Sequence, residues 1–80
     1  MNKRILEFAK LPLEERIKVI MLFGVSLMTI PHCGLIGSLF TLGTEYVEMM
    51  ADTRTGEIVH LGIADYSDLN KYAAHIDLDI

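Results

Sequence analysis

The sequence lacks tryptophan, has a single cysteine and carries few basic residues, and each scarcity excludes a class of protein. One cysteine, Cys33, cannot build an internal disulfide framework. Seven Lys and Arg against eleven Asp and Glu give a net charge of -4, which argues against a nucleic-acid partner. The hydrophobic fraction of 51% excludes intrinsic disorder. Eighty residues rarely enclose a catalytic cleft, so we expect a protein that is not an enzyme.

Charge is also absent from one long internal stretch, and this gap dominates the reading of the sequence. No Asp, Glu, Lys or Arg occurs from Val19 to Thr44. The stretch is longer than the roughly twenty apolar residues that a membrane-spanning helix needs. The sequence therefore predicts a mainly α, single-pass membrane protein whose transmembrane helix covers residues 19–44.

Pro31 lies near the middle of this stretch, so we expect one long helix that is kinked there. A hairpin of two helices is disfavoured, because arms of about twelve residues are too short to span a bilayer. A cleaved signal peptide is a second alternative, but no alanine occurs between Ala9 and Ala51 to form a cleavage site. A soluble protein with a buried, wholly apolar helix is the third alternative.

The segment before the stretch, residues 1–18, is basic and amphipathic. It predicts a short interfacial helix on the cytoplasmic side and the start of the spanning helix near Pro12. Because basic residues concentrate there, we expect an inner (cytoplasmic or organellar) membrane, with the N-terminus inside and the C-terminus outside or periplasmic. The predicted membrane-interface residues are Lys3, Arg4, Arg16, Lys18 and Tyr46.

The segment after the stretch, residues 45–80, is acidic and predicts a small α+β or irregular extramembrane tail. A turn is expected over 52–56, where Gly56 can take a positive φ, and short strands over 57–63 and 75–80. Asp65 or Ser67 could cap a short helix that ends near Ala74. Since two short strands are not stable alone in water, we expect this tail to pair with another protein.

His32 is the predicted cofactor-contacting residue, because it would lie near the bilayer centre. There it could ligate a haem or pigment metal, bond a quinone or relay protons. Alternatively, neutral His32 bonds a neighbouring helix or a carbonyl freed by Pro31. The chain itself is expected to hold no cofactor, so any pigment, haem, quinone or lipid would come from its partners.

Small residues follow His32 at helical spacing and predict a helix-packing face against larger integral membrane subunits. They are Gly34, Gly37, Ser38 and Thr41. Cys33 would be buried in the span and inert. Metal-capable side chains occur near the C-terminus, but their spacing matches no zinc or calcium motif. They are His60, Asp65, Asp68, His75, Asp77 and Asp79.

These features together predict a non-catalytic accessory subunit that stabilises a larger membrane protein complex. A photosynthetic or respiratory host is suggested by general analogy alone. The alternatives are a homo-oligomeric pore, or a viral or phage membrane protein, with His32 facing the pore. A soluble helical module is the remaining alternative.

Overall fold

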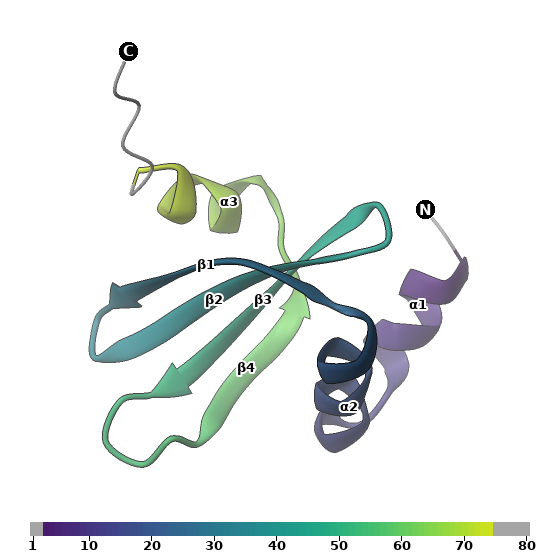
Figure 1. Ribbon diagram of the computed structural model, residues 1–80, viewed down its shortest axis with the longest axis horizontal. Coiled ribbons are helices and arrows are strands. Elements are labelled where there is room, and N and C mark those ends of the chain that lie inside the picture. Colours follow the sequence, from purple (N-terminus) through teal and green to yellow (C-terminus); the bar gives the residue numbers. More distant parts are fainter. Residues whose placement is uncertain (1–2, 75–80) are drawn as a thin grey trace.

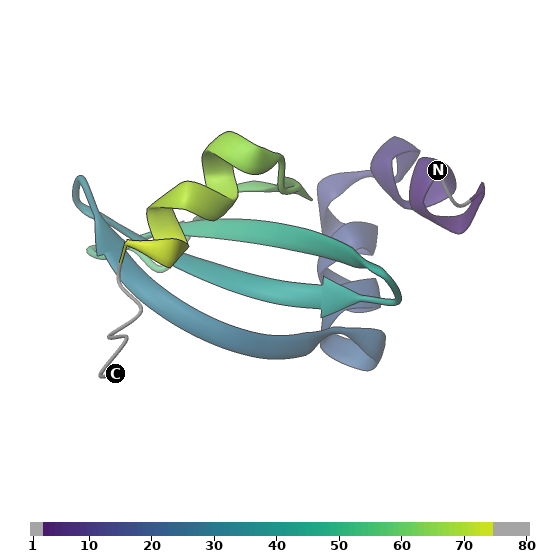
Figure 2. The same ribbon diagram turned by 90° about the horizontal axis from the view of Figure 1, so that it is seen from above.

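The computed structural model describes the backbone of residues 3–74 and the side chains of residues 6–74. Two helices come first, four strands follow, and a third helix ends the described chain (Figure 1). The elements are α1 (Lys3–Lys10), α2 (Leu13–Phe23), β1 (Val25–His32), β2 (Leu35–Leu42), β3 (Glu45–Asp52), β4 (Ile58–Ile63) and α3 (Tyr66–Ala73). The strands form one antiparallel sheet in the order β1-β2-β3-β4. Helix α3 lies over one face of the sheet, and α1 and α2 lie at one end (Figure 2).

The predicted single-pass, mainly α fold is wrong, because the uncharged stretch 19–44 does not form one helix. It holds the end of α2, strands β1 and β2, and two tight turns. Within residues 3–74, no helix combines the length and the apolar character that crossing a membrane requires. Pro31, expected to kink a helix, lies instead in the edge strand β1, where a missing N–H is tolerated.

The turns explain why this apolar stretch forms strands. Gly24 ends α2 with an extended backbone, at φ -75 and ψ 149. Cys33 and Gly34 both have positive φ, 51 and 79, which matches the two-residue type I′ turn that suits the twist of a β-hairpin. Gly43 has a φ of 62 in the next two-residue turn. These turns leave two strands of eight residues each, far shorter than a spanning helix.

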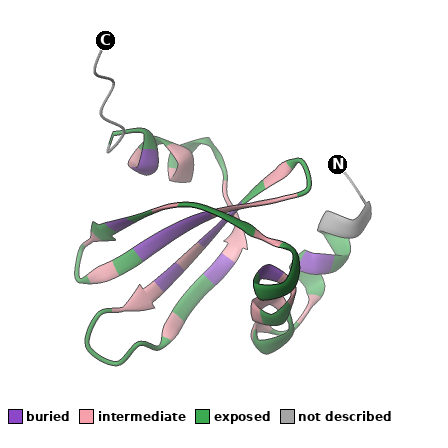
Figure 3. Ribbon diagram, in the orientation of Figure 1, coloured by how far each residue is buried: buried purple, intermediate pink, exposed green. Residues whose placement is uncertain are grey.

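Apolar side chains pack against parts of both faces of the sheet. On one face, Phe8 of α1 and Ile20 of α2 pack with Val47 and Leu61. On the other face, Tyr72 of α3 forms a second core cluster with two residues of the sheet, Ile30 and Leu39. Figure 3 shows buried positions in adjacent strands of the sheet and on the helices beside it. A strand covered on both faces reads as a continuous apolar run rather than an alternating one, which fits β2, whereas β1 is uncharged although five of its eight residues are exposed.

Both edges of the sheet carry features that oppose the addition of another strand. In β1, Leu27 is an extra, unpaired residue in a bulge, and Pro31 cannot donate a hydrogen bond. In β4, Val59 is the extra residue of a second bulge. Arg16 of α2 reaches β4 and donates a hydrogen bond to the carbonyl of Leu61. Bulges and edge prolines are common means of preventing edge-to-edge association.

Several short elements lie where the sequence predicts them. Helix α1 lies within the segment where a short N-terminal helix was expected, and β4 coincides with the strand expected over 57–63. Gly56 takes the positive φ expected of the 52–56 turn. Asp65 caps α3 and exchanges hydrogen bonds of 2.9 and 3.0 Å with Asp68, which confirms the predicted cap. The strand expected over 75–80 lies outside the described residues.

Close packing between β2 and α3 gives a first testable prediction. A Cβ atom at Gly37 would lie 2.7 Å from the hydroxyl oxygen of Tyr72, too close for a real contact. We expect Gly37→Ala to lower the free energy of unfolding in urea by roughly 1–3 kcal/mol through overpacking. In a Tyr72→Phe background, which lacks the hydroxyl, the same substitution should cost less than half as much.

Gly62→Ala in β4 is the matched control for this prediction. Its Cβ would lie 3.4 Å from the His60 ring, an ordinary contact distance. The Gly62→Ala variant also carries the general effect on the free energy of unfolding of replacing a strand glycine by alanine. Equal costs at Gly37 and Gly62, or no relief from Tyr72→Phe, would contradict the packing described here.

Candidate functional site

A buried carboxylate lies beneath α3, on the face of the sheet that this helix covers. Glu48 of β3 is only 2% exposed. Its Oε2 atom lies 2.8 Å from Lys71 Nζ, and Lys71 Nζ also lies 3.5 Å from Asp68 Oδ1. From the neighbouring strand β4, His60 Nε2 approaches Glu48 Oε1 to 3.9 Å. Three elements thus bring four polar side chains together, which we call the α3 clamp: Glu48, His60, Asp68 and Lys71.

The surroundings shift the pKa values of Lys71 and Asp68 in this cluster, and of Tyr72 beside it. The pKa of Lys71 is raised, chiefly because it donates a hydrogen bond to Glu48, although partial burial opposes the shift. Burial alone would raise the pKa of Asp68, but hydrogen bonding to Asp65 and the charge of Lys71 lower it. Burial and the nearby Glu48 raise the pKa of Tyr72. The cluster therefore binds α3 to the sheet through the contact of partly exposed Lys71 with the buried carboxylate of Glu48.

The position of the α3 clamp limits what it can do chemically. A general acid or base must come within hydrogen-bond reach of its substrate. The carboxylate of Glu48 is covered by α3 and already faces Lys71, so a substrate could reach it only if the helix moved. The geometry of the described residues thus supports a structural role, in which the ion pair holds α3 over the sheet.

An open apolar groove runs beside α3 on the same face. Its volume is about 580 Å³, within the range of sites that hold small ligands or inserted side chains. It is lined by Leu27, Met28, Leu39, Tyr46, Leu69, Tyr72 and Ala73. None of the lining residues is charged. The groove can therefore bind apolar or aromatic groups, but it offers no ionic contact.

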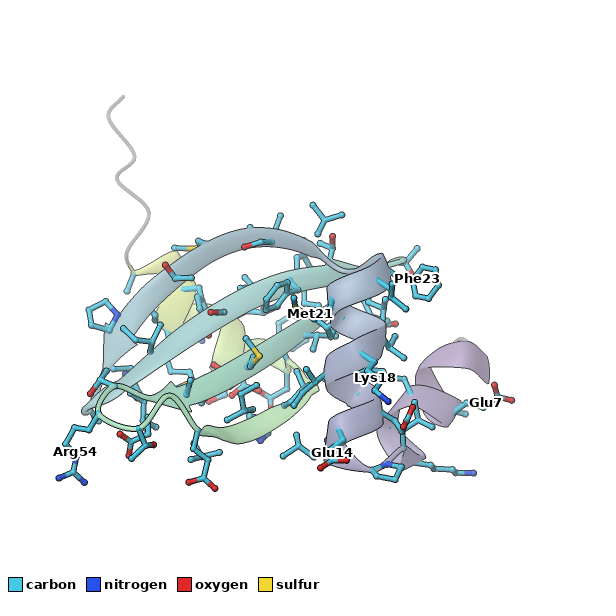
Figure 4. All side chains as sticks on the ribbon, turned by 60° about the horizontal axis from the view of Figure 1, so that its bottom comes forward. Glu7, Glu14, Lys18, Met21, Phe23 and Arg54 are labelled. Carbon is cyan, nitrogen blue, oxygen red and sulfur yellow. The ribbon has the colours of Figure 1, made fainter. Side chains whose placement is uncertain are left out.

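Five exposed apolar side chains follow one another along the chain where α2 passes into β1. We call this set the junction surface, and its members are Met21, Leu22, Phe23, Val25 and Leu27. Each of the five side chains is between 49% and 78% exposed. Figure 4 shows Met21 and Phe23 at the end of α2 that leads into β1, with Lys18 and Glu14 farther along the helix. Leu27 belongs to both features, so the junction surface continues into the groove.

His32, predicted to contact a cofactor, is the last residue of β1 and is half-buried opposite Leu35. His32 does not lie at the centre of a spanning helix, because residues 25–32 form a strand. The next residue, Cys33, was expected to be buried in the span. That expectation is wrong, because Cys33 is exposed in the turn. Hydrogen bonds to the Gly34 carbonyl, from the hydroxyl and N–H of Thr53 at 2.9 and 3.4 Å, tie this turn to the β3–β4 loop.

The residues predicted to form a helix-packing face do not share one face. Gly34 lies in the β1–β2 turn, and the other three lie in β2. Successive side chains of a strand point to opposite faces, so Gly37 and Thr41 lie on the α3 side and Ser38 lies on the other. The predicted face depended on a helix of 3.6 residues per turn, and that premise is wrong here.

The predicted membrane-interface residues are also dispersed. Arg16 bonds the edge of β4, and Lys18 lies 3.5 Å from Glu15 on the surface of α2. Tyr46 is exposed and lines the groove. Lys3 and Arg4 fall within α1, but their side chains are outside the described part.

Other expectations concern metal-capable residues. Among the side chains of residues 6–74, no three His, Cys, Asp or Glu gather as the ligands of a metal ion would. Of the residues considered at the C-terminus, Asp65 and Asp68 cap α3, and His60 faces Glu48. His75, Asp77 and Asp79 lie outside the described residues.

Sequence reasoning missed the features that the structure makes most prominent. It placed the residues of the junction surface within a spanning helix. The glycine directly after Phe23 was the available signal that the helix ends there. Glu48 gave a weaker signal, because it is one of three acids in the strand Glu45–Asp52, and the sequence does not show which of them a helix will cover.

No protein-family model matches this chain, and no curated protein and no solved structure matches it either.

The α3 clamp gives a second prediction. Lys71→Met leaves the buried carboxylate of Glu48 without its cation, and should lower the free energy of unfolding at pH 7 by roughly 3 kcal/mol. Adding Glu48→Leu to that variant should recover most of the loss, because two apolar side chains leave no buried charge that needs a partner of opposite charge. Denaturation in urea measures both effects.

Lys18→Met is the control, since Lys18 and its partner Glu15 form an exposed pair on α2. It should change the free energy of unfolding by less than about 0.5 kcal/mol. If Lys71→Met were as mild as this control, or if Glu48→Leu failed to rescue it, the pair would not hold α3.

The raised pKa values of Tyr72 and Lys71 give a third prediction. A group whose pKa is higher in the folded than in the unfolded protein stabilises the fold below its unfolded pKa. That contribution is lost as the pH rises through the folded value. The free energy of unfolding should therefore fall above about pH 10, where exposed Tyr and Lys begin to titrate.

Tyr72→Phe should make this alkaline decline shallower, whereas Tyr66→Phe, at an exposed position, should leave it unchanged. Thermal unfolding followed from pH 8 to pH 11 (about two units below to one above the ordinary pKa of tyrosine) measures the slope. Identical slopes in the wild type and the Tyr72→Phe variant would contradict the assignment.

Proposed function

We propose that this protein is a non-catalytic binding module that docks onto a partner protein through the junction surface. The observation that supports this is the exposure of five large apolar side chains within residues 21–27 of a small chain. Together they expose on the order of 500 Å² of apolar surface, spread over more than one side of the end of α2. Patches of this size commonly mark sites of protein association.

The neighbouring groove strengthens the proposal. Interfaces derive most of their binding energy from a few aromatic or aliphatic anchors that fill pockets. The groove is uncharged and adjoins the junction surface at Leu27. An apolar side chain of the partner could therefore occupy the groove while the rest of the partner covers Met21, Leu22 and Phe23.

This proposal keeps part of the function expected from the sequence and omits the rest. It retains a non-catalytic protein that acts by binding a partner. It omits the pore with His32 at its centre, because that pore was built on a helix over 19–44, where residues 25–32 and 35–42 form strands. The proposed orientation, with the N-terminus inside, loses its basis for the same reason.

A double variant, Leu22→Ser with Phe23→Ser, tests the proposal. Because both side chains are exposed, the free energy of unfolding should change by less than about 0.5 kcal/mol per site. Binding of the partner should weaken at least tenfold, since burying one such side chain contributes about 1.5–3 kcal/mol. The measurement is quantitative mass spectrometry of proteins that co-purify with the tagged chain from the cells that make it.

The control variant is Val59→Ser with Tyr66→Ser, which removes two exposed apolar side chains outside the junction surface. It should retain the same partners in the same amounts as the wild type. If both double variants retained identical partners, the junction surface would not be the binding site.

A further inference from the structure

We infer that residues 75–80 of this chain occupy the apolar groove beside α3, with the side chains of Ile76, Leu78 and Ile80 against its walls. These residues lie outside the described part of the structure, and their sequence and the groove itself support the placement. The placement concerns the chain without a partner, so it does not depend on the proposed function. Its failure would leave the junction surface available as a binding site.

The groove lies where the described chain ends. Its α3 wall consists of Leu69, Tyr72 and Ala73, which share one side of the helix because they are three and four positions apart. Ala73 is the last residue of α3, and Ala74 follows it with a helical backbone. Residue 75 is therefore separated from a wall of the groove by a single residue.

Six residues are long enough to cross the groove. An extended chain advances about 3.3 Å per residue, so residues 75–80 can span roughly 20 Å. The α3 wall from Leu69 to Ala73 is only about 6 Å long, at about 1.5 Å per helical residue. The remaining lining residues belong to three adjacent strands, which together are roughly 10 Å wide. After one reversal of the chain near Ala74, the segment can cover the groove in either direction.

The sequence of residues 75–80, His-Ile-Asp-Leu-Asp-Ile, has the alternation of a strand with one apolar side. In an extended conformation Ile76, Leu78 and Ile80 point to one side and the three polar residues to the other. The apolar side can therefore enter the groove while the carboxylates remain in water. The described residues leave apolar area there to be covered, since the lining side chains of Leu27 and Tyr46 are 49% and 41% exposed.

Charge favours this groove over a second hollow beside α3. The second hollow, of about 440 Å³, is lined in part by Glu45 and Asp65. A segment lying there would bring Asp77 and Asp79 near these carboxylates, and like charges in proximity oppose the contact. No residue that lines the apolar groove is charged. The acidic segment therefore meets repulsion at the second hollow and none from the lining of the groove.

Covalent attachment to α3 distinguishes this segment from a separate apolar partner. A group joined to its site by a short linker has an effective concentration in the millimolar range. A separate protein must reach a similar concentration, or bind correspondingly more tightly, to take its place. Residues 75–80 therefore act as an internal competitor, and a side chain of a partner enters the groove only by displacing them.

Nuclear Overhauser effects in the full chain test the placement. With isotope-labelled Ile, Leu and Met methyl groups, cross-peaks are expected from the segment, Ile76, Leu78 or Ile80, to Met28 in the groove. Their absence would overturn the inference if the core residues Ile30 and Leu39 still give cross-peaks to each other. A mixture of labelled and unlabelled chains identifies the source of the segment. Cross-peaks between differently labelled chains would place the segment of a second copy in the groove and would also overturn the inference.

A change in the groove should remove these cross-peaks. Leu27→Asp introduces a carboxylate at the lining, which opposes burial of the segment and repels its two acids. Val59→Asp is the matched control, because Val59 is exposed and does not line the groove. We expect Leu27→Asp to abolish the cross-peaks to Met28 and Val59→Asp to preserve them. Cross-peaks that persist in both variants would overturn the inference.

Unfolding in urea gives a second readout, independent of the groove variants. Replacing all three apolar residues, Ile76→Ser with Leu78→Ser and Ile80→Ser, should raise the equilibrium constant for unfolding at least about tenfold, because it removes apolar contacts with the groove. The control Asp77→Asn with Asp79→Asn alters the other side of the same segment and should change the constant less than about threefold. Equal effects of the two variants would overturn the inference.

Discussion

The ion pair between Lys71 and the buried Glu48 is the contact on which the arrangement of this small protein depends. A charge removed from water is strongly destabilising unless an opposite charge accompanies it. Glu48 can occupy the face of β3 because α3 brings Lys71 to 2.8 Å from its carboxylate. The same helix buries Tyr72 against Ile30 and Leu39. The position of α3 therefore determines both the second core cluster and one wall of the apolar groove.

The other face of the sheet has a different requirement. Helices α1 and α2 supply Phe8 and Ile20 to a core with Val47 and Leu61, so the buried face of α2 is committed to the sheet. Ile20 lies in the last turn of α2, and the three apolar side chains after it, Met21, Leu22 and Phe23, remain exposed. A chain of 80 residues has too little mass to cover every apolar surface of a four-stranded sheet and its helices. The exposed remainder is the surface that we propose for association.

Local features were predictable from the sequence where short-range chemistry decides them. The cap at Asp65, the positive φ of Gly56 and the alternation that gives β4 all depend on a few neighbouring residues. The fold class was not predictable in the same way, because an apolar run suits a spanning helix or a pair of covered strands equally well. Glycines at positions 24, 34 and 43 divide this run at intervals that fit strands, and they carried the information that hydropathy alone obscured.

By itself, the sequence determined the separation of charged from uncharged segments, the positions of the turns and the capping of α3, since each depends on residues close together in the chain. Only the tertiary structure decided which apolar residues are covered and which stay exposed. It also decided that Glu48 meets Lys71, and that His32 lies at a hairpin instead of a bilayer centre. These outcomes depend on strand pairing and on which face each helix covers. Both are long-range contacts, and the composition of any one segment does not specify them.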